Sequence, residues 1–330
     1  MSENKKILLS GVKPTGRPHI GNYFGAMRQF AELQNKYQSF FMIADLHSLT
    51  SSDVQKNPKQ LEEDTLSVAM DYLAIGLDPK KSIIFKQSDV PAHSELTWIF
   101  DCLTTMPYLM RAHAFKDAEA KNKEINVGVF NYPMLMASDV LLYGADLVPV
   151  GQDQKQHIEI ARDTATKFNN IYGETFKLPE ALIMPEVAIV PGIDGQKMSK
   201  SYGNTIPLFA TDEEIDKAVA GIVTDSKGVD DSKDPTGDNI FSLYRLFATV
   251  EEQNILAEKY RKGGLSYKEA KGELKKKLKE FITPLRERRQ KIENNRNKVK
   301  KILESGGKKT RKVAEEKMKE VRRKTGLNSN

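Results

Sequence analysis

The apolar residues of the first two thirds of the chain follow two alternating patterns. Short continuous apolar runs, bounded by turn residues, have the length and composition of buried strands. The longer segments between them repeat apolar residues every three or four positions, as amphipathic helices do. The runs predicted as strands are 6–12, 39–50, 81–89 and 146–151. The segments predicted as helices are 22–37, 58–77, 94–106, 133–145 and 153–173.

Strands that alternate with helices at these lengths predict an α/β fold with a doubly wound, Rossmann-like parallel sheet. Ligands of such sheets bind at the carboxyl ends of the strands. The strand pattern stops after residue 201, and the remaining periodicity is helical. We therefore expect a boundary between 202 and 210, which divides the chain into a Rossmann-like domain, 1–204, and a C-terminal helical domain, 205–330.

The length and the charge distribution of the chain agree with two domains. At 330 residues the chain exceeds the roughly 250 to 300 residues at which single cores stop growing. Residues 271–330 carry 22 Lys and Arg against 8 Asp and Glu. Apolar residues at helical spacing interrupt this basic stretch, which favours folded helices with a cationic outer face. Such a face is either simply solvated or binds a polyanion such as RNA or DNA.

Several classes of protein are excluded by composition. Cys102 is the single cysteine, so disulfides, cysteine-ligated zinc and iron–sulfur clusters within one chain are excluded. The five histidines form no zinc-hydrolase motif, and we expect any metal to arrive with a substrate. The chain has no run of about 18 uncharged apolar residues and no cleaved signal-peptide pattern at its N-terminus. We therefore expect a cytoplasmic protein that does not bind membranes.

The first predicted strand leads into the stretch SGVKPTGRPHIGNYFGAM. Gly11 and Gly16 have the spacing of a phosphate-binding P-loop, but Arg17 and Pro18 stand where that loop requires lysine and serine or threonine. The letters HIGN follow at the predicted start of a helix, whose free N–H groups favour phosphate. Gly21 has no side chain to block a ribose or base. The stretch is either a nucleotide-binding turn or a tight structural one.

Two aspartates, Asp139 and Asp153, each allow a structural and a functional interpretation. In VPVGQDQKQ, Asp153 follows a predicted strand and Gly151. It either caps the next helix or, with its polar neighbours, binds ribose hydroxyls and a substrate amine. Asp139 lies among apolar residues in YPMLMASDVLLY and is either exposed or buried. If it is buried it needs hydrogen-bond donors, because its ionisation is otherwise costly.

The loop GQKMSKSYGN places Lys197 and Lys200 between two glycines, with Met198 available as an apolar anchor. Two lysines three residues apart can span two phosphates of a pyrophosphate, and the flanking glycines allow the loop to close over them. The alternative is a solvated, lysine-rich loop.

These stretches, in this order, resemble the bacterial-type tryptophanyl-tRNA synthetases, a family of class I aminoacyl-tRNA synthetases. PHIGN corresponds to the HIGH motif of that class, and KMSKS at 197–201 matches its second signature. The segment MASDVLLYGADLVPVGQDQKQHIEIARD separates this family from the tyrosyl enzymes. The resemblance covers nearly the whole chain and weakens towards its C-terminal end.

The resemblance implies a tryptophan–tRNA ligase with a catalytic domain for ATP and tryptophan and a helical domain that binds the tRNA anticodon. Such an enzyme activates L-tryptophan with Mg²⁺-bound ATP to tryptophanyl-adenylate and pyrophosphate. It then transfers the amino acid to the 3′-terminal ribose of tRNA(Trp). The resemblance also implies a homodimer, for which the aromatic and methionine residues of 98–110 are suitable, and neither a DNA partner nor a protein-bound metal.

The same resemblance assigns roles to individual residues. Lys197 and Lys200 neutralise the phosphates as pyrophosphate leaves, and Asp139 accepts the indole N–H. The residues implied for ATP are Lys13, Pro14, Thr15, Gly21, Asn22, Gly151, Gln152, Asp153, Ile189, Lys197, Met198, Ser199, Lys200 and Ser201. The residues implied for tryptophan are Asp139, Tyr132, Met136, His47, Val148, Val150 and Gln154. Without the resemblance, His47 is interpreted as a satisfied core histidine.

Some positions depart from the family pattern. Lys13 and Ala114 stand where many relatives have glutamine. The segment after Ala114 also differs, so Lys116, Lys121 and Lys123 are all candidates for a phosphate contact. Three other functions stay open: a tyrosyl-tRNA synthetase, an RNA-binding relative that has lost catalysis, and a nucleotidyltransferase that does not act on tRNA.

Overall fold

The structure is a computed structural model. It describes residues 5–120, 125–151, 154–183 and 190–327. The chain folds into two compact units, each built from separate segments. Unit 1 consists of Met1–Gly16, Phe30–Pro185 and Asn295–Asn330, and unit 2 of Arg17–Gln29 and Glu186–Asn294.

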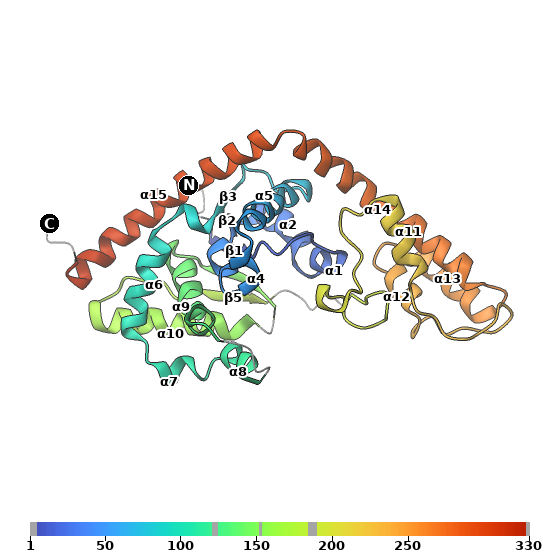
Figure 1. Ribbon diagram of the computed structural model, residues 1–330, viewed down its shortest axis with the longest axis horizontal. Coiled ribbons are helices and arrows are strands. Elements are labelled where there is room, and N and C mark those ends of the chain that lie inside the picture. The colour runs from blue at the N-terminus through green and yellow to red at the C-terminus, as the bar shows by residue number, and fades with distance from the viewer. Residues whose placement is uncertain (1–4, 121–124, 152–153, 184–189, 328–330) are drawn as a thin grey trace. The chain divides into compact units, whose positions relative to one another are not determined.

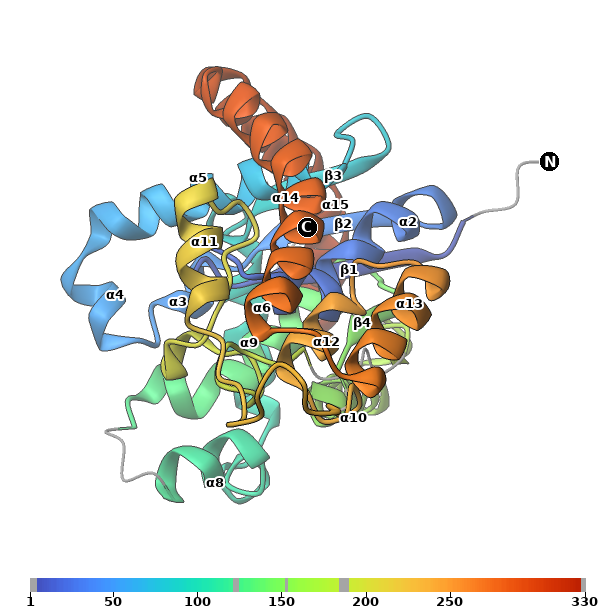
Figure 2. The same ribbon diagram turned by 90° about the vertical axis from the view of Figure 1, so that its right-hand side faces the viewer.

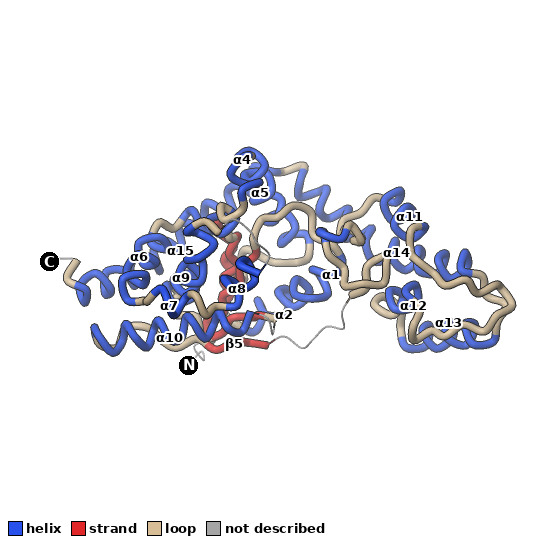
Figure 3. Tube along the Cα trace, turned by 60° about the horizontal axis from the view of Figure 1, so that its bottom comes forward, coloured by secondary structure: helices blue, strands red, loops and turns tan. Residues whose placement is uncertain are grey.

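Unit 1 is built on a five-stranded parallel sheet in the order β3-β2-β1-β4-β5, with helices on both sides (Figures 1 and 3). This confirms the predicted α/β, Rossmann-like fold class. The strands are β1 (Ile7–Val12), β2 (Gln38–Ile43), β3 (Ser82–Lys86), β4 (Leu147–Val150) and β5 (Glu180–Ile183). The helices are α2 (Arg28–Lys36), α3 (Asp45–Ser48), α4 (Ser52–Lys56), α5 (Pro58–Ala74), the 3₁₀ turn η2 (Gln87–Asp89), α6 (Ala92–Leu103), α7 (Met106–Leu109), α8 (His113–Ala120), α9 (Val127–Leu142), α10 (Lys155–Tyr172) and α15 (Arg296–Thr325).

Successive side chains of a strand point to opposite faces of the sheet, and in the central strands the side chains on both faces are apolar. On one face, Phe40 and Phe85 join a core that also contains residues of α6, α9, α10 and α15. On the other face, the ring of Phe41 contacts those of Phe30 and Tyr72, which come from α2 and α5. The central strands therefore read as continuous apolar runs, as the sequence suggested.

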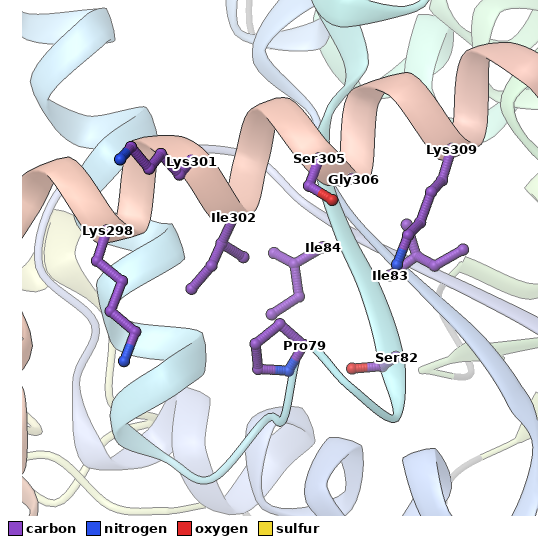
Figure 4. A pocket seen from close by; sticks show the side chains of 10 residues that line it. All are labelled: Pro79, Ser82, Ile83, Ile84, Lys298, Lys301, Ile302, Ser305, Gly306 and Lys309. Atoms are coloured by element: carbon purple, nitrogen blue, oxygen red, sulfur yellow. The ribbon is translucent and has the colours of Figure 1, made fainter.

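Helix α15 packs against β3, a strand at one end of the sheet (Figures 1 and 4). The approach is close at Gly306, where a Cβ atom would lie 1.9 Å from the carbonyl oxygen of Ile84. A cavity of about 190 Å³ remains beside this contact, with Pro79, Ile84 and Ile302 among the residues that line it. The last helix of the chain is thus part of the sheet unit.

Unit 2 contains the HIGN and KMSKS segments together with the helices labelled α11 to α14 in Figure 2. Phe24, which follows HIGN, contacts the rings of Phe247 and Phe281. The elements are α1 (Ile20–Asn22), the π-helical turn η1 (Tyr23–Met27), the 3₁₀ turn η4 (Lys200–Tyr202), α11 (Asp212–Ala220), α12 (Asn239–Tyr244), α13 (Val250–Lys262) and α14 (Tyr267–Glu293).

The units do not coincide with the division expected near residue 204. Segment 17–29 belongs to unit 2 because of the Phe24 contacts, and segment 295–330 belongs to unit 1 because α15 packs on the sheet. The assignment of catalytic and anticodon-binding roles to 1–204 and 205–330 stays a prediction.

Local differences from the predicted elements have simple causes. The predicted strand 39–50 ends at Ile43, and α3 follows it. The predicted helix 94–106 ends at Leu103, and Pro107 instead occupies the first turn of α7, where proline is tolerated. Strand β5 was not predicted, because it has four residues and they are only partly buried.

Candidate active site

A cavity of about 400 Å³ in unit 1 lies at the carboxyl ends of β1, β2 and β4, and helix α9 contributes to its wall. This is the position that the predicted fold class favours for a ligand. All seven residues predicted to bind tryptophan line it: His47, Tyr132, Met136, Asp139, Val148, Val150 and Gln154. They come from segments separated by up to about a third of the chain, and the fold brings them together.

Asp139 is the buried polar group of this cavity, with 2% of its surface exposed. His47 Nε2 lies 2.8 Å from Asp139 Oδ2, and Gln87 donates a 2.8 Å hydrogen bond to Oδ1. His93 Nδ1 lies 2.6 Å from Oδ1, although its N–H is not aligned for a regular hydrogen bond. The choice between an exposed and a buried Asp139 is therefore decided in favour of burial.

The charge of Asp139 depends on these neighbours. Burial alone would raise the pKa of its carboxyl group. The contacts with His93 and His47 outweigh that effect and hold the pKa of Asp139 below its ordinary value. Each carboxylate oxygen can accept about two hydrogen bonds. Among the described residues, Oδ1 has two contacting donors and Oδ2 has one, so Oδ2 retains an acceptor position.

Lys13 and Tyr132 form a polar part of the same cavity. The Lys13 ammonium lies 5.6 Å from the centre of the Tyr132 ring. The pKa of Lys13 is lowered by desolvation, although its side chain as a whole is exposed. The Tyr132 hydroxyl lies 3.0 Å from His157 Nε2, which fixes the ring at the cavity wall.

The residues Lys13, Pro14 and Thr15 also line a neighbouring cavity of about 560 Å³ in unit 1. His47 borders both cavities. Gly151, predicted to bind ATP, lines the first cavity. Four of the predicted ATP residues are therefore gathered around two adjoining cavities of unit 1.

HIGN and the KMSKS loop contact each other within unit 2. A Cβ atom on Gly21 would lie 2.9 Å from His19 Nδ1 and 3.5 Å from Met198 Cβ. The backbone N–H of Ile20 donates to the carbonyl of Ile206 over 3.0 Å. Asn22 closes the turn through its side-chain oxygen, which accepts from His19 N–H.

Met198 anchors the KMSKS loop, as the sequence suggested, since only 4% of its surface is exposed. A second anchor, Asn204, was not predicted. Its side chain accepts from Ser199 N–H over 2.8 Å and donates to Asp194 Oδ1 over 2.8 Å. Lys197 and Lys200 are both exposed. The loop thus has a fixed base from which two lysines project to the surface of unit 2.

His19 and Lys200 are close enough to interact electrostatically. Burial, with a further contribution from the Lys200 charge, lowers the pKa of His19 from 6.5 to about 4. The imidazole is therefore neutral at pH 7, within reach of the positive charge of Lys200. The hydroxyls of Ser199 and Ser201 lie 2.9 Å apart beside it.

Several predicted residues lie outside the described residues: Gln152, Asp153, Ile189, Lys121 and Lys123. The side chain of Ala114 is likewise not described. Lys116 is exposed on α8. In the described part of the chain, no group of three or more His, Cys, Asp or Glu is arranged to hold a metal ion. No described helix is both long and apolar enough to cross a membrane.

Four residues in or behind the site were missed by the sequence analysis: Gln87, His93, Asn204 and Tyr143, whose hydroxyl lies 2.7 Å from His93 Nε2. Gln87 directly follows β3, at the carboxyl end of the strand where ligand-binding residues collect, but the predicted strand 81–89 included this residue and so hid the signal. His93 and Tyr143 gave no signal, because a single histidine or tyrosine among apolar residues is typical of any core.

Comparisons with known proteins identify the family of this chain. The family model described as class I tRNA synthetases (W and Y) matches residues 1–283. The chain is 50% identical to the tryptophan–tRNA ligase of Fusobacterium nucleatum over 326 residues, covering 98% of this chain and 99% of that one. It is 48% identical to that of Rhodopirellula baltica, covering 97% and 99%. The crystal structure of Campylobacter jejuni tryptophanyl-tRNA synthetase, complexed with ADP and tryptophan, superposes with a TM-score of 0.92 at 43% identity, covering 97% and 99%. The chain therefore belongs to the tryptophanyl-tRNA synthetases of the class I family.

Proposed function

We propose that this chain is a tryptophan–tRNA ligase that uses the buried carboxylate of Asp139 to select its amino acid. In the first step the carboxylate of L-tryptophan attacks the α-phosphorus of ATP, and pyrophosphate leaves. In the second step a 3′-terminal ribose hydroxyl of tRNA(Trp) attacks the carbonyl carbon of the adenylate, and AMP leaves. The observation that carries the proposal is an anionic, buried Asp139 in the wall of an otherwise largely apolar cavity.

Recognition of tryptophan follows from the composition of that wall. Met136, Val148 and Val150 offer apolar surface for the indole ring, and Asp139 Oδ2 offers an acceptor for its N–H. Phenylalanine has no ring donor, so it would leave the acceptor unpaired. Sites built to bind a polar group reject analogues that lack it by about 10⁴ to 10⁵. Tyr132 and Gln154 are the polar groups proposed for the α-amino group.

Catalysis of the first step is proposed to rest on charge stabilisation by Lys197 and Lys200. Negative charge builds on the departing pyrophosphate, and preorganised cations stabilise that charge more in the transition state than in the ground state. The two lysines are exposed and stand on a loop anchored at Met198 and Asn204. A side chain at Gly21 would clash with the His19 imidazole, so glycine keeps the HIGN turn compact at the place proposed for the nucleotide. Mg²⁺ enters with the phosphates of ATP as part of the substrate.

Binding of tRNA is proposed for the basic region 205–330. Lys276 and Lys291 of α14 are exposed, and no ion pair of either is found among the described residues. Replacing such a lysine by alanine should weaken tRNA binding and reduce the salt dependence of log K by about one unit per lost phosphate contact. Pyrophosphate exchange, which needs no tRNA, should be unchanged.

We further propose a cytoplasmic homodimer that pairs through the segment 98–110. Trp98 is 70% exposed, Met106 is 66% exposed and Met110 is 47% exposed, and large exposed apolar side chains are enriched at interfaces. Light scattering coupled to size-exclusion chromatography should give twice the chain mass. Trp98→Ser should shift the mass towards the monomer, whereas Ile255→Ser, which changes a 52% exposed residue of α13, should not.

The test of the proposed activity is amino-acid-dependent ATP–pyrophosphate exchange with each of the twenty amino acids. Exchange with tryptophan alone supports the proposal. Exchange with tyrosine and none with tryptophan would assign the chain to the tyrosyl enzymes. Binding of tRNA without exchange for any amino acid would show a relative that has lost catalysis.

A further inference from the structure

His93 and Tyr143 extend the contacts of Asp139 into the core of unit 1. His93 Nδ1 lies 2.6 Å from Asp139 Oδ1, and the Tyr143 hydroxyl lies 2.7 Å from His93 Nε2. His93 has no exposed surface, and Tyr143 has 3% exposed. Neither residue lines the cavity in which Asp139 stands. They therefore act on a ligand only through Asp139.

The direction of these contacts follows from the chemistry of the three groups. A carboxylate has no proton to donate, so the 2.6 Å approach of His93 Nδ1 to Asp139 Oδ1 is favourable only with a proton on Nδ1, although that N–H is not aligned for a regular hydrogen bond. Burial, together with the charge of Asp139, raises the pKa of Tyr143, so its hydroxyl stays protonated and donates to Nε2. This arrangement places a proton on Nδ1 of His93, facing Asp139, while Nε2 faces the Tyr143 hydroxyl. The Tyr143 hydroxyl therefore donates to His93, and the N–H of His93 faces the Asp139 carboxylate.

Aromatic packing holds the two side chains in this orientation. The Phe85 ring stacks on the His93 ring with an interplanar angle of 18°. Tyr143 is stacked on Phe40 and meets Phe85 edge to face. A rotation of either polar ring would disturb the packed core on this face of the sheet. The contact with Asp139 is thus fixed by apolar neighbours from two strands.

We propose that His93 and Tyr143 are positioning residues that keep the Asp139 carboxylate anionic and oriented, so that its second oxygen, Oδ2, selects for a ring N–H donor. This inference rests on the proposed function, in which Asp139 accepts the indole N–H. His47 contacts Asp139 from α3 at the cavity wall, and Gln87 contacts it from η2 without lining the cavity. His93 contacts Oδ1 from the core and does not line the cavity. This contact limits rotation of the carboxylate whether or not a ligand is bound.

The test compares tryptophan with L-3-benzothienylalanine, an analogue with sulfur in place of the ring N–H. For each variant we measure the ratio of the two kcat/KM values in pyrophosphate exchange. In Tyr143→Phe the donor to His93 is lost, and we expect the ratio to fall about tenfold, as for loss of a buried hydrogen bond to a charged network. The activity with the analogue should change little, because it makes no use of the acceptor.

Two substitutions of His93 distinguish a positioning role from a packing role. The side-chain nitrogen of asparagine falls near the position of Nδ1, and that of glutamine near Nε2. His93→Asn keeps a donor for Asp139 and should retain most of the ratio, whereas His93→Gln should lose about tenfold. Equal ratios in His93→Asn, His93→Gln and the unaltered protein would overturn the inference.

Matched controls separate the inference from folding and from the proposed function. Tyr72→Phe removes a buried hydroxyl that has no hydrogen-bond partner in the described residues, and its ratio should equal that of the unaltered protein. If Asp139→Asn leaves the ratio unchanged, the proposed indole contact itself fails. If Asp139→Asn lowers the ratio while Tyr143→Phe and His93→Gln do not, only the positioning role fails.

Discussion

The side-chain amide of Asn204 donates a 2.8 Å hydrogen bond to Asp194 Oδ1, bridging the two ends of the KMSKS loop. The oxygen of the same side chain accepts a hydrogen bond from Ser199 N–H. Asn204 is 2% exposed, so a single buried side chain holds both ends of the loop. A Cβ on Gly192 would lie 2.3 Å from its Nδ2, which leaves space there only for glycine.

Asn204→Ala should slow tryptophan-dependent pyrophosphate exchange by about tenfold to 100-fold. The expected cause is loss of lysine positioning, since a buried group left unsatisfied costs about 1–3 kcal/mol. Steady-state exchange kinetics with varied ATP measure the effect. Asn254→Ala, at an exposed position of α13, is the control and should behave as the unaltered protein. Unchanged kcat in Asn204→Ala would show that the loop base does not matter for catalysis.

Lys200→Ala should lower kcat of adenylate formation more than it raises the KM for ATP. The reason is that the contact strengthens as charge moves onto pyrophosphate. Pre-steady-state adenylate formation separates the two constants. Lys217→Ala, which changes another exposed lysine of unit 2, should leave both unchanged. A raised KM with an unchanged kcat would contradict the proposed role.

Asp139→Asn should weaken the use of tryptophan by about 100-fold or more in kcat/KM, with the KM for ATP largely kept. The amide loses the charge, and its NH₂ group faces the donors His47, Gln87 or His93. An unsatisfied or opposed buried donor costs about 1–3 kcal/mol. Exchange kinetics and calorimetric titration with tryptophan measure the effect. Unaltered tryptophan affinity would remove Asp139 from the recognition site.

The stability of the protein should fall as the pH falls from 6.5 to about 4 because of His19. Its folded-state pKa is lowered to about 4, so in this window the unfolded chain binds more protons than the folded chain. The contribution of His19 to the free energy of unfolding is therefore complete above pH 6.5. It falls by on the order of 1–3 kcal/mol towards pH 4. Urea unfolding across the window should show a shallower pH dependence in His19→Gln, and identical slopes would contradict the assignment.

Gly306→Ala should destabilise unit 1 by about 1–3 kcal/mol, because the new methyl group meets the Ile84 carbonyl and the helix must shift. Gly272→Ala is the matched control. It lies inside α14 with no atom within 4 Å of a new Cβ, so it should stabilise by about 0.5–1 kcal/mol. Thermal unfolding of both variants measures the difference. A neutral Gly306→Ala would show that α15 adjusts at little cost.

The fold class was predictable because the buried strands and their flanking helices leave strong periodic signals. The predicted run 39–50 contains nearly all of β2, and 146–151 contains the whole of β4. Strand β5 left too weak a signal. It is short, and its last residue, Ile183, is exposed.

Residues of the candidate site were predictable where a short sequence motif contains them. Met198 and Lys200 could be recognised from a ten-residue loop. His93 could not, because its importance lies in a contact with Asp139, far along the chain, that exists only once α6 packs on α9. The same holds for Gly306, whose constraint comes from Ile84 on a distant strand. Contacts between distant segments leave no periodic trace in a single sequence.

The packing of α15 on β3 has a consequence for biosynthesis. The strand is complete at Lys86, but the helix that covers it ends at Thr325, so nearly the whole chain is translated before the two can meet. At a translation rate of roughly 5 to 20 residues per second, β3 stays uncovered by α15 for tens of seconds. Open strand edges pair readily with other chains. Nascent chains and C-terminal truncations should therefore depend on chaperones that bind exposed strands, and a stop codon before residue 296 should yield aggregates.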